Sequence, residues 1–445
     1  MLFSAPEFQF TRDGVCQNLR SDGRENHEAR PVEISLGNHE CKLSKSFNKK
    51  KRNMMIITRA VGQAKVRMGK GSCGRTEVVC AITGQVCSFD EDEEEDALLL
   101  FMGQRRSGGG GGRDKTGGNE KAGTSTAATM PSVEVYVETM STRNVGSAVG
   151  GGKKGQHQQQ VFNETDKYCG ELKRELEFAY GSMDLLNKGS GLRKSLEIGG
   201  SSHGNGSKQG GRRRHRWKLR MDFLVLSDDG NALDALAIAG KCALFDARLP
   251  RVRVKRRGED EEVELVSDSE EEEEDDDDDE QLEKGKEKES NSSSSSNTTL
   301  DVSDVPLIAT ATYFGRARQQ EGVTTMTTIT IDDEEFLPTI AIDCVSSEES
   351  CGDFALAVSA TREGAVTSVQ RVGGFGNSSA MAVESDVSDN VIKFARKHCV
   401  KIHGEIDSYL STLALREDED EEDEDSLASS ESEDEEMEEA NQDEF

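Results

Sequence analysis

Hydrophobic positions in the first half of the chain follow a strand-like pattern. Strands are predicted at 32–37, 76–86 and 132–140 because apolar residues alternate with polar ones or form short β-branched runs. In the last segment every second residue from Val133 is a valine, which indicates a strand with one buried face. Apolar residues then recur every three or four positions across 166–198, and this spacing predicts a helix.

The longest uninterrupted folded pattern lies in the middle of the chain. A strand is predicted at 217–226, a polar turn at 227–231 and a helix at 232–247. The helix consists mostly of small apolar residues, and alanines recur every four residues from Ala235 to Ala243. Such a surface lets a helix lie close to a sheet. A basic, extended stretch follows.

The second half repeats the order of strands before a helix. Strands are predicted at 305–315, 325–331, 337–343, 353–361 and 365–374. The Glu-Gly pair at 363–364 predicts a hairpin turn between the last two strands. A helix is predicted over 387–414, with Ile402, Ile406 and Tyr409 on its apolar face.

Gly-rich, Ser-rich and acidic runs interrupt this pattern and set the expected domain boundaries. The predicted fold class is α+β, built from two units that each place several strands before a long helix. The predicted segments are an N-terminal extension at 1–17, a first unit at 18–255 with flexible insertions near 88–130, 141–160 and 199–215, an acidic and Ser-rich insert at 256–300, a second unit at 301–416 and a disordered acidic tail at 417–445.

The charge of the chain is unevenly distributed. The net charge is −31, but the segments 90–96, 256–289 and 417–445 hold 45 acids against 5 bases. The rest of the chain has 41 acids and 50 bases, so a mildly basic body carries acidic loops and an acidic tail. Such a body is compatible with binding nucleic acid, which a uniformly acidic protein would repel. Only 33% of residues are hydrophobic, so much of the chain lies outside a core.

The ten cysteines show no metal-binding spacing. No Cys-x-x-Cys and no Cys/His quartet is present, so neither a metal nor another cofactor is expected, and the thiols are predicted to be reduced, as in an intracellular protein. No apolar run reaches the roughly 18–20 residues that a membrane helix needs. The N-terminal residues lack the features of a secretory signal. We therefore expect a soluble protein of the nucleus or the cytoplasm.

Four blocks of the sequence resemble the RNase PH superfamily, in the family's order. They are "NLRSDGRENHEARPVEI", "AKVRMG…RTEVVCAITGQV", "WKLRMDFLVLSDDGNALDALAIAGKCALFDARLPRVRV" and the pair "DVPLIATATYFG" with "IDCVSSEESCGDFALAVSATREGAVTSVQRVGG". The residues that match the family's signature are Asp22, Gly23, Arg24, Asp343, Glu348 and Glu349. The resemblance implies the RNase PH-type fold, which is similar to ribosomal protein S5 domain 2.

Within this superfamily the sequence is similar to the ring subunits of the RNA exosome. The resemblance implies a hexameric ring of RNase PH-like subunits arranged as heterodimers, capped by S1/KH-type subunits, through which RNA passes. The expected partners are therefore other ring subunits, cap subunits and RNA, with neither DNA nor a membrane.

The resemblance also locates the place where catalysis would occur. Catalytic relatives carry two aspartates six residues apart just before the strand at 353–361. This chain has Ser347 at the first position and Asp353 at the second. One carboxylate cannot form the pair that binds a metal or assists proton transfer. Asp353 is interpreted as a solvated residue at the start of a strand, and the Gly-rich stretch 371–379 as a loop and not as a phosphate cradle.

Basic residues are the candidates for contact with RNA. They are Arg67, Lys70, Arg75, Arg212, Arg213, Arg214, Arg251 and Arg253. Contacts from such residues to phosphates bind RNA without reading its sequence. The run at 248–254 is also compatible with a subunit interface or an edge strand. The bases at 49–52 and 211–218 are compatible with nuclear localisation or with plain exposed loops.

The histidines and the acidic runs carry weaker signals. His203 and His215 are assigned to flexible loops, and His398 and His403 lie five residues apart on a helix, so none is predicted to bind a metal. The acidic runs fit solvated tails, contacts with basic proteins, or competition with RNA for the basic surface.

Three functions remain open from the sequence. The favoured one is a non-catalytic structural subunit of the exosome ring that supports 3′-to-5′ RNA processing and degradation. The second is an active phosphorolytic 3′-to-5′ exoribonuclease of the same superfamily that takes the missing acid from elsewhere. The third is an acidic chaperone for basic nuclear proteins.

Overall fold

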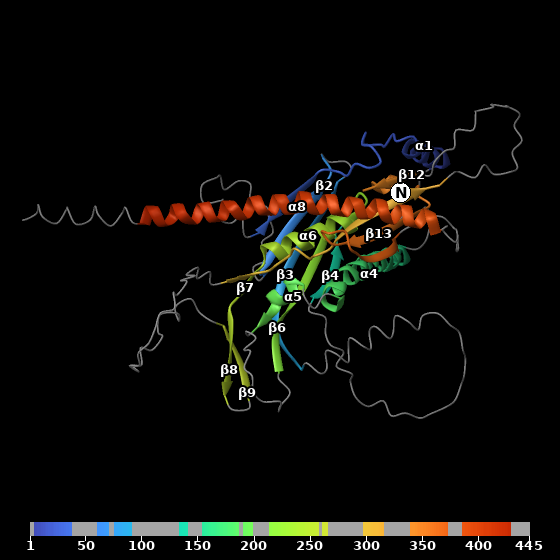
Figure 1. Cartoon of the computed structure of the whole chain (residues 1–445). Coiled ribbons are helices and arrows are strands. Elements are labelled where there is room, and N and C mark those ends of the chain that lie inside the picture. The colour runs from blue at the N-terminus through green and yellow to red at the C-terminus, as the bar shows by residue number, and fades with distance from the viewer. Residues whose placement is uncertain are drawn as a thin grey trace, which may run out of the picture.

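A computed structural model shows two larger β-sheets with helices packed against them, and two further two-stranded sheets (Figure 1). The structure describes residues 4–37, 60–70, 75–90, 133–140, 154–186, 190–198, 213–257, 260–265, 297–315, 339–372 and 385–428. The predicted strand 325–331 lies outside the described residues, as do the Gly-rich stretch 105–118 and most of 371–379. No described helix is both long and apolar enough to cross a membrane.

The larger sheet belongs to the first predicted unit. Its strand order is β1-β2-β3-β6-β4, and the short strand β5 also pairs with β6. The strands are β1 (Val32–Leu36), β2 (Gly62–Met68), β3 (Thr76–Asp90), β4 (Val133–Thr139), β5 (Glu197–Ile198) and β6 (Arg213–Ser227). All neighbours are antiparallel except β4 and β6, which are parallel. A parallel pair needs a long crossover, and α4 and α5 supply it.

The helices between β4 and β6 differ from the single predicted helix at 166–198. The structure has α4 (Lys154–Leu186) and then a separate short helix, α5 (Gly191–Leu196). Ser190 begins α5 because its side chain accepts a hydrogen bond from the backbone N–H of Arg193. The predicted flexible insertion 141–160 is wrong from Lys154 onward, where α4 has already begun.

The smaller sheet forms the second unit, with strand order β12-β11-β13-β14. Its elements are β11 (Leu307–Phe314), β12 (Thr339–Ile342), α7 (Ser346–Glu349), β13 (Phe354–Ala360), β14 (Val366–Val372) and α8 (Ser385–Ala428). The predicted hairpin turn is confirmed, since Gly364 has a φ of +77° and its N–H donates to the Thr361 carbonyl. The tail predicted to be disordered from 417 is helical as far as Ala428.

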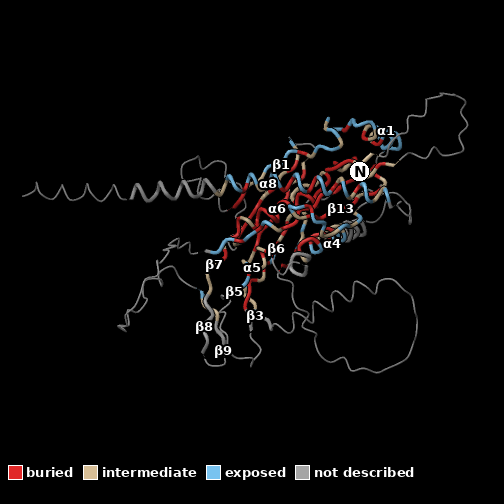
Figure 2. Tube along the Cα trace, in the orientation of Figure 1, coloured by how far each residue is buried: buried red, intermediate tan, exposed pale blue. Residues whose placement is uncertain are grey.

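Helix α6 (Ala232–Asp246) lies between the two sheets and contacts β2, β3 and β11. It is buried almost all round, as Figure 2 shows, which fits its nearly uninterrupted apolar sequence. Ala235, Ala239 and Ala243 are completely buried. The close approach is visible at Gly62, where an added Cβ would lie 2.4 Å from the carbonyl oxygen of Ala243.

Helix α8 covers the smaller sheet and also reaches α6. Its buried face includes Ala395, Cys399, Ile402, Ile406 and Leu410. Sequence periodicity placed Tyr409 on this face, but its side chain is 39% exposed and its hydroxyl donates to the backbone of β1. Leu410, the next residue, is buried instead. The periodicity therefore predicted the buried face of the helix correctly but misplaced it by one residue at this end.

A buried lysine links α6 to α8. The Nζ atom of Lys241 lies 2.7 Å from Asp407 Oδ1 and 3.0 Å from His403 Nδ1, and the lysine is wholly buried. The other ring nitrogen of His403 is 3.0 Å from the Ala360 carbonyl oxygen. Desolvation and the nearby Lys241 lower the pKa of His403 to about 4, so this imidazole stays neutral and accepts a hydrogen bond.

Smaller strands lie within the predicted insert 256–300 and in the basic, extended stretch before it. β7 (Arg248–Pro250) pairs with β10 (Asn297–Thr299), and β8 (Val252–Arg257) pairs with β9 (Asp260–Leu265). The predicted insert 256–300 therefore contains strands at both ends. Strands β3 and β6 likewise extend into the predicted insertions 88–130 and 199–215, because the two pair as far as Asp90 and Arg213.

Helix α1 (Ala5–Cys16) lies within the predicted N-terminal extension. Ser4 and Glu7 form a capping box, in which the side chain of each binds the backbone N–H of the other. The Ser-x-x-Glu spacing, with Pro6 in the first turn, is a helix-start signal that the sequence itself contains.

Replacing Gly62 with alanine tests the close approach of β2 to α6. The added methyl group meets the backbone of Ala243 and Ala247, which cannot move without shifting α6. We expect the variant to lose about 1–3 kcal/mol of unfolding free energy, measured by chemical denaturation. The matched control is Gly170→Ala in α4, where no atom lies within 4 Å of the added Cβ and helix propensity favours alanine. Equal stability of the two variants would contradict the packing described.

Candidate functional site

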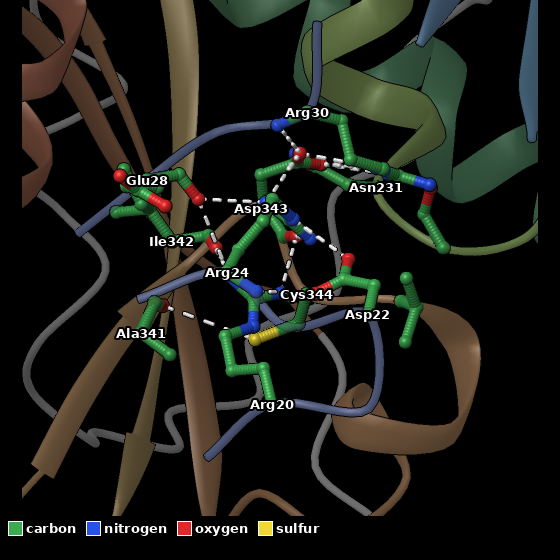
Figure 3. Close-up of polar contacts among 12 residues, drawn as sticks. Arg20, Asp22, Arg24, Glu28, Arg30, Asn231, Ala341, Ile342, Asp343 and Cys344 are labelled. Atoms are coloured by element: carbon green, nitrogen blue, oxygen red, sulfur yellow. Dashed lines mark hydrogen bonds and ion pairs between the residues drawn. The ribbon is translucent and has the colours of Figure 1, made fainter. Parts of the chain in front are cut away.

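Three segments that are far apart in the sequence meet at one end of the larger sheet. They are residues 20–30, the turn 228–231 between β6 and α6, and residues 343–349 of the second unit. Figure 3 shows their arginine and carboxylate side chains converging. We call this group of contacts the arginine–carboxylate junction. It contains all six residues that resemble the family signature.

Asp343 is the centre of the junction. Its carboxylate accepts hydrogen bonds from the backbone N–H and the guanidinium of Arg30, with Arg30 Nη2 2.6 Å from Asp343 Oδ1. Asn231 Nδ2 donates to the same oxygen at 3.0 Å, and Arg24 Nη1 donates to Oδ2 at 3.2 Å. Asp343 itself has a φ of +46°, a left-handed conformation that aspartate and asparagine tolerate better than most residues.

The charge state of Asp343 follows from these contacts. Burial alone would raise the pKa of this carboxyl group, because the residue is only 1% exposed. The positive charges and hydrogen bonds of Arg30 and Arg24 outweigh burial, and the pKa lies below its usual value. Asp343 is therefore ionised at neutral pH and holds two arginines in place.

A second buried ion pair lies beside the first. Arg20 Nη2 is 2.6 Å from Glu348 Oε2, and neither side chain is exposed to solvent. Arg20 also donates to the carbonyl oxygens of Ile342 and Asp343. Sequence analysis selected Glu348 but not Arg20 or Arg30. Both belong to the motif "LRSDGRENHEAR", so the arginines that flank the signature were the available signal.

The signature residues at 22–24 form the outer part of the junction. Arg24 Nε is 2.7 Å from Asp22 Oδ2, and its guanidinium also donates to the carbonyl oxygens of Glu28 and Asp343. Gly23 adopts a φ of +79° in the turn between them, which favours glycine. The Asp22–Arg24 pair is partly exposed, unlike the pairs of Asp343 and Glu348.

The turn between β6 and α6 completes the junction. Gly230 has a φ of +92°, and an added Cβ would lie 2.5 Å from the Cys344 carbonyl oxygen. Arg30 Nη2 donates to the Gly230 carbonyl, and the N–H of Asn231 donates to Glu349 Oε1 at 2.6 Å. The signature residue Glu349 therefore binds the backbone at the start of α6. The polar turn predicted at 227–231 is confirmed.

Next to the junction lies a buried carboxyl group whose pKa is raised, whereas the pKa of Asp343 is lowered. Asp234, in the first turn of α6, accepts hydrogen bonds from Asn231 Nδ2 and from the backbone and hydroxyl of Thr310. Complete burial outweighs these hydrogen bonds and raises the pKa of Asp234 to about 7. No arginine hydrogen bond to Asp234 is found within the described residues, in contrast to Asp343.

Asp353, which matches the second acid of the pair in catalytic relatives, contacts an arginine from α1. Arg12 Nη2 lies 2.8 Å from Asp353 Oδ2, and Nη1 lies 3.0 Å from Oδ1, so the guanidinium binds both oxygens. Arg12 also donates to the carbonyl oxygens of Gly315 and Cys351. The interpretation of Asp353 as simply solvated was wrong, because its side chain is 42% exposed but paired with a largely buried arginine. Ser347 lies in α7.

The predicted RNA-contact residues do not form one surface. Arg67 and Arg75 both approach Glu77 at one end of β3, next to the arginine–carboxylate junction, and Lys70 is exposed nearby. Arg213 and Arg214 pair with the opposite end of β3, at Asp90 and Phe89. Arg251 follows β7, and Arg253 lies in β8. Arg212 lies outside the described residues.

Three bases surround the carboxylate of Glu77. Burial would raise the pKa of Glu77, but Lys65, Arg67 and Arg75 lower it below its usual value. Lys65 Nζ is 2.5 Å from Glu77 Oε1, and Arg67 Nε is 3.3 Å from the same oxygen. Arg67 Nη1 also lies 3.8 Å from Glu33 Oε2, so these three bases face two carboxylates and carry one positive charge in excess, which suits phosphate contacts.

The histidines differ in part from the prediction. His215 does not lie in a flexible loop: it is buried in β6. His398 and His403 are both buried on α8, and His203 lies outside the described residues. Across the described part of the chain, no group of three or more His, Cys, Asp or Glu side chains is arranged to hold a metal ion.

Comparison with known proteins gives a match for part of the first unit. Residues 135–250 match the model described as the 3′ exoribonuclease family, domain 1 (RNase PH). The match runs from β4 to the end of β7 and covers about a quarter of the chain. The resemblance to the RNase PH superfamily is thereby confirmed for this segment, which carries an RNase PH-type domain. The predicted α+β fold class is confirmed as well.

Two solved structures are also similar. One is described as an archaeal exosome core, with 15% identity and a TM-score of 0.42, covering 90% of this chain and 96% of that chain. The other is the Archaeoglobus fulgidus exosome with RNA bound to the active site, with 18% identity and a TM-score of 0.41, covering 89% of this chain and 98% of that chain. Identities and scores this low bear on neither the site nor the function.

Replacing Asp343 with asparagine tests the junction. Asparagine keeps the shape and tolerates the backbone conformation, but it removes the negative charge that the buried Arg30 and Arg24 bind. We expect a loss of about 3–5 kcal/mol in unfolding free energy at pH 7, measured by urea denaturation. The matched control is Asp22→Asn, which breaks a partly exposed pair and should cost about 1 kcal/mol or less.

The same variants predict a pH dependence. Because the pKa of Asp343 is lowered in the folded state, its contribution is present above the pKa of an unfolded aspartate and is lost as the pH falls through the folded value. The stability difference between the wild-type protein and Asp343→Asn should therefore shrink on acidification below about pH 4. A difference that stays constant down to pH 2 would contradict the charge assigned to Asp343.

Proposed function

We propose that this chain is a non-catalytic structural subunit of the RNA exosome core ring. The family match of residues 135–250 supports the RNase PH part of this proposal. The wider sequence blocks, which include the signature residues of the arginine–carboxylate junction, extend the resemblance to the exosome ring subunit called ribosomal RNA-processing protein 42. In this role the chain supports 3′-to-5′ processing and degradation of RNA, including maturation of ribosomal RNA and decay of messenger RNA.

The observation that carries the non-catalytic part is the pairing of Asp353 with Arg12. Catalytic relatives place a second acid at the position of Ser347, where this chain has a hydroxyl group. The single remaining carboxylate binds a guanidinium through both oxygens, which supports a structural role for this acid. The signature carboxylates Asp343, Glu348 and Glu349 are also bound to arginines or to backbone N–H groups.

The basic residues support passive contact with RNA. The end of the larger sheet with Arg67, Lys70 and Arg75 presents more positive than negative charge. Binding through phosphates alone would be insensitive to sequence and sensitive to salt. This is the behaviour expected of a subunit past which any RNA must move.

The partners proposed are other RNase PH-like ring subunits and S1/KH-type cap subunits. Pairing within a hexameric ring would bury further surface of this chain, as oligomer interfaces do. The nucleus, the nucleolus and the cytoplasm are the proposed locations, in keeping with this role.

A phosphorolysis assay tests the non-catalytic assignment. The full-length chain is incubated with 3′-labelled RNA and inorganic phosphate, and release of nucleoside diphosphates is measured. We expect no release above background. The same assay on complexes purified with the chain should give equal activity for wild type and Asp353→Asn. Release by the isolated wild-type chain that Asp353→Asn abolishes would establish the alternative, an active exoribonuclease.

A further inference from the structure

Helix α8 carries a row of basic side chains on the face that points away from the smaller sheet. From position 390 to position 404 the helix holds four bases and no acid. The bases are Lys393, Arg396, Lys397 and Lys401, and all four are exposed. We call these four residues the α8 basic stripe. None of them was predicted from the sequence to contact RNA, because apolar residues separate them and no long run of bases is visible.

The spacing of the four bases places them on one side of the helix. Residues three or four positions apart are neighbours on the surface of an α-helix, and the stripe follows this spacing from 393 to 401. Val391, Ala395 and Cys399 lie on the other side, where they are buried in the core of the smaller sheet. At 1.5 Å per residue the stripe extends over about 12 Å of helix. Figure 1 shows α8 along the outside of the molecule.

Few of these charges are balanced by an ion pair. Lys401 Nζ lies 3.8 Å from Glu405 Oε1, and both side chains are more exposed than buried, so this pair contributes little. Lys393, Arg396 and Lys397 form no ion pair with any other residue that the structure describes. Their charges are therefore available to an anionic ligand.

The turn between β13 and β14 lies against the stripe. A Cβ added to Gly364 would be 3.0 Å from Arg396 Nε and 3.1 Å from Val400 Cγ2. The turn adds one exposed acid, Glu363, and one further base, Arg362, whose side chain is 58% exposed. The basic surface therefore continues from α8 onto the end of the smaller sheet.

Positive charge exceeds negative charge around the stripe. Asp407 lies 2.7 Å from the buried Lys241, which balances its charge. With Arg362 the exposed bases number five, and they face three exposed acids, which are Asp389, Glu405 and Glu363. The difference leaves two positive charges in excess, which favours an anionic ligand.

The two histidines of this stretch add no charge at neutral pH. His398 and His403 are both buried on the sheet side of α8. Desolvation lowers the pKa of each imidazole to about 4. The positive charge of the surface therefore comes from lysine and arginine.

The composition of the stripe favours phosphates over a protein surface as its ligand. Protein interfaces are poor in lysine and are anchored by aromatic and other large side chains. Three of the four stripe residues are lysines, and Val400 is the only exposed apolar residue of the described segment 393–401. A lysine binds a phosphate as a point charge and needs no fixed geometry.

We propose that the α8 basic stripe is a further surface that binds the phosphates of single-stranded RNA. The inference rests on the proposed role of the chain in handling RNA and adds a contact surface in the second unit, apart from the bases around Glu77 in β3 of the larger sheet. Binding releases the counterions of the contacted phosphates, so it weakens as salt rises. No aromatic residue of 393–401 is exposed, so the contact involves no base stacking and no preference for sequence.

The test compares RNA binding by full-length variants. The stripe variant is Lys393→Gln/Lys397→Gln/Lys401→Gln, in which glutamine keeps a high helix propensity. We expect its affinity for a labelled oligouridylate to fall on the order of tenfold at 0.1 M salt. The slope of log K against log salt should flatten by about 2, because each phosphate contact of a single strand contributes about 0.7. Fluorescence anisotropy at several salt concentrations measures both quantities.

Two control variants separate this effect from a change in net charge or in packing. Lys167→Gln/Lys173→Gln/Lys194→Gln removes the same charge from α4 and α5 and should leave affinity within about twofold of wild type, since distant exposed charges are screened. Lys393→Arg/Lys397→Arg/Lys401→Arg keeps the charge of the stripe and should also bind within about twofold of wild type. Far-UV circular dichroism checks that all variants are folded.

The outcomes distinguish this inference from the proposed function. If wild type binds RNA and the stripe variant binds with the same affinity and salt slope, or if the α4 and α5 variant loses as much, the inference is overturned and the proposed function stands. If the stripe variant binds RNA normally but recovers fewer partner chains on purification, the stripe is an interface with an acidic protein and the inference is likewise overturned. Absence of RNA binding by wild type, alone and in purified complexes, would overturn the proposed function itself.

Discussion

The buried carboxylate of Asp343 is the contact on which the rest of the structure depends. It lies in the second unit, and its two arginine partners come from the N-terminal segment that leads into the larger sheet. Taking three charged groups out of water costs several kcal/mol for each ion, and only close hydrogen bonds in fixed geometry offset that cost. Arg30 provides such geometry because its backbone N–H and its guanidinium bind the same carboxylate. The two units are therefore joined by an interaction that tolerates little displacement.

The residues selected by their resemblance to the RNase PH superfamily hold separate parts of this chain together. Glu348 and Glu349 bind Arg20 and the N–H of Asn231, so each fixes backbone at the boundary between the units. Asp353 binds Arg12 and fixes helix α1 to the smaller sheet. In each case the carboxylate binds a donor from elsewhere in the chain. Charge in this region stabilises the fold.

Sequence patterns predicted the regular elements well where one physical signal dominated. The alternating valines of β4 and the closely spaced alanines of α6 have a single interpretation, and both elements were found. Element ends were less predictable: β6 begins at Arg213 because it pairs with a long β3, and no local pattern contains that pairing. The β8–β9 pair was missed because acidic residues are individually unfavourable in strands, and no local pattern in β9 indicates that it pairs with β8.

The candidate site was predictable in composition but not in geometry. The resemblance selected Asp343, Glu348 and Arg24, yet their partners Arg20 and Arg30 needed the three-dimensional structure. Arg12 was missed for a different reason: its helix has a clear capping signal, but nothing local indicates that it binds a residue more than three hundred positions away.

Purification of the tagged full-length chain from the cells that express it, followed by mass spectrometry, tests the central claim most directly. The claim is that this chain is a structural member of a ring of RNase PH-like subunits. The account predicts recovery of other RNase PH-like chains and S1/KH-type cap proteins at comparable amounts. Recovery of the chain without any RNase PH-like partner would contradict it.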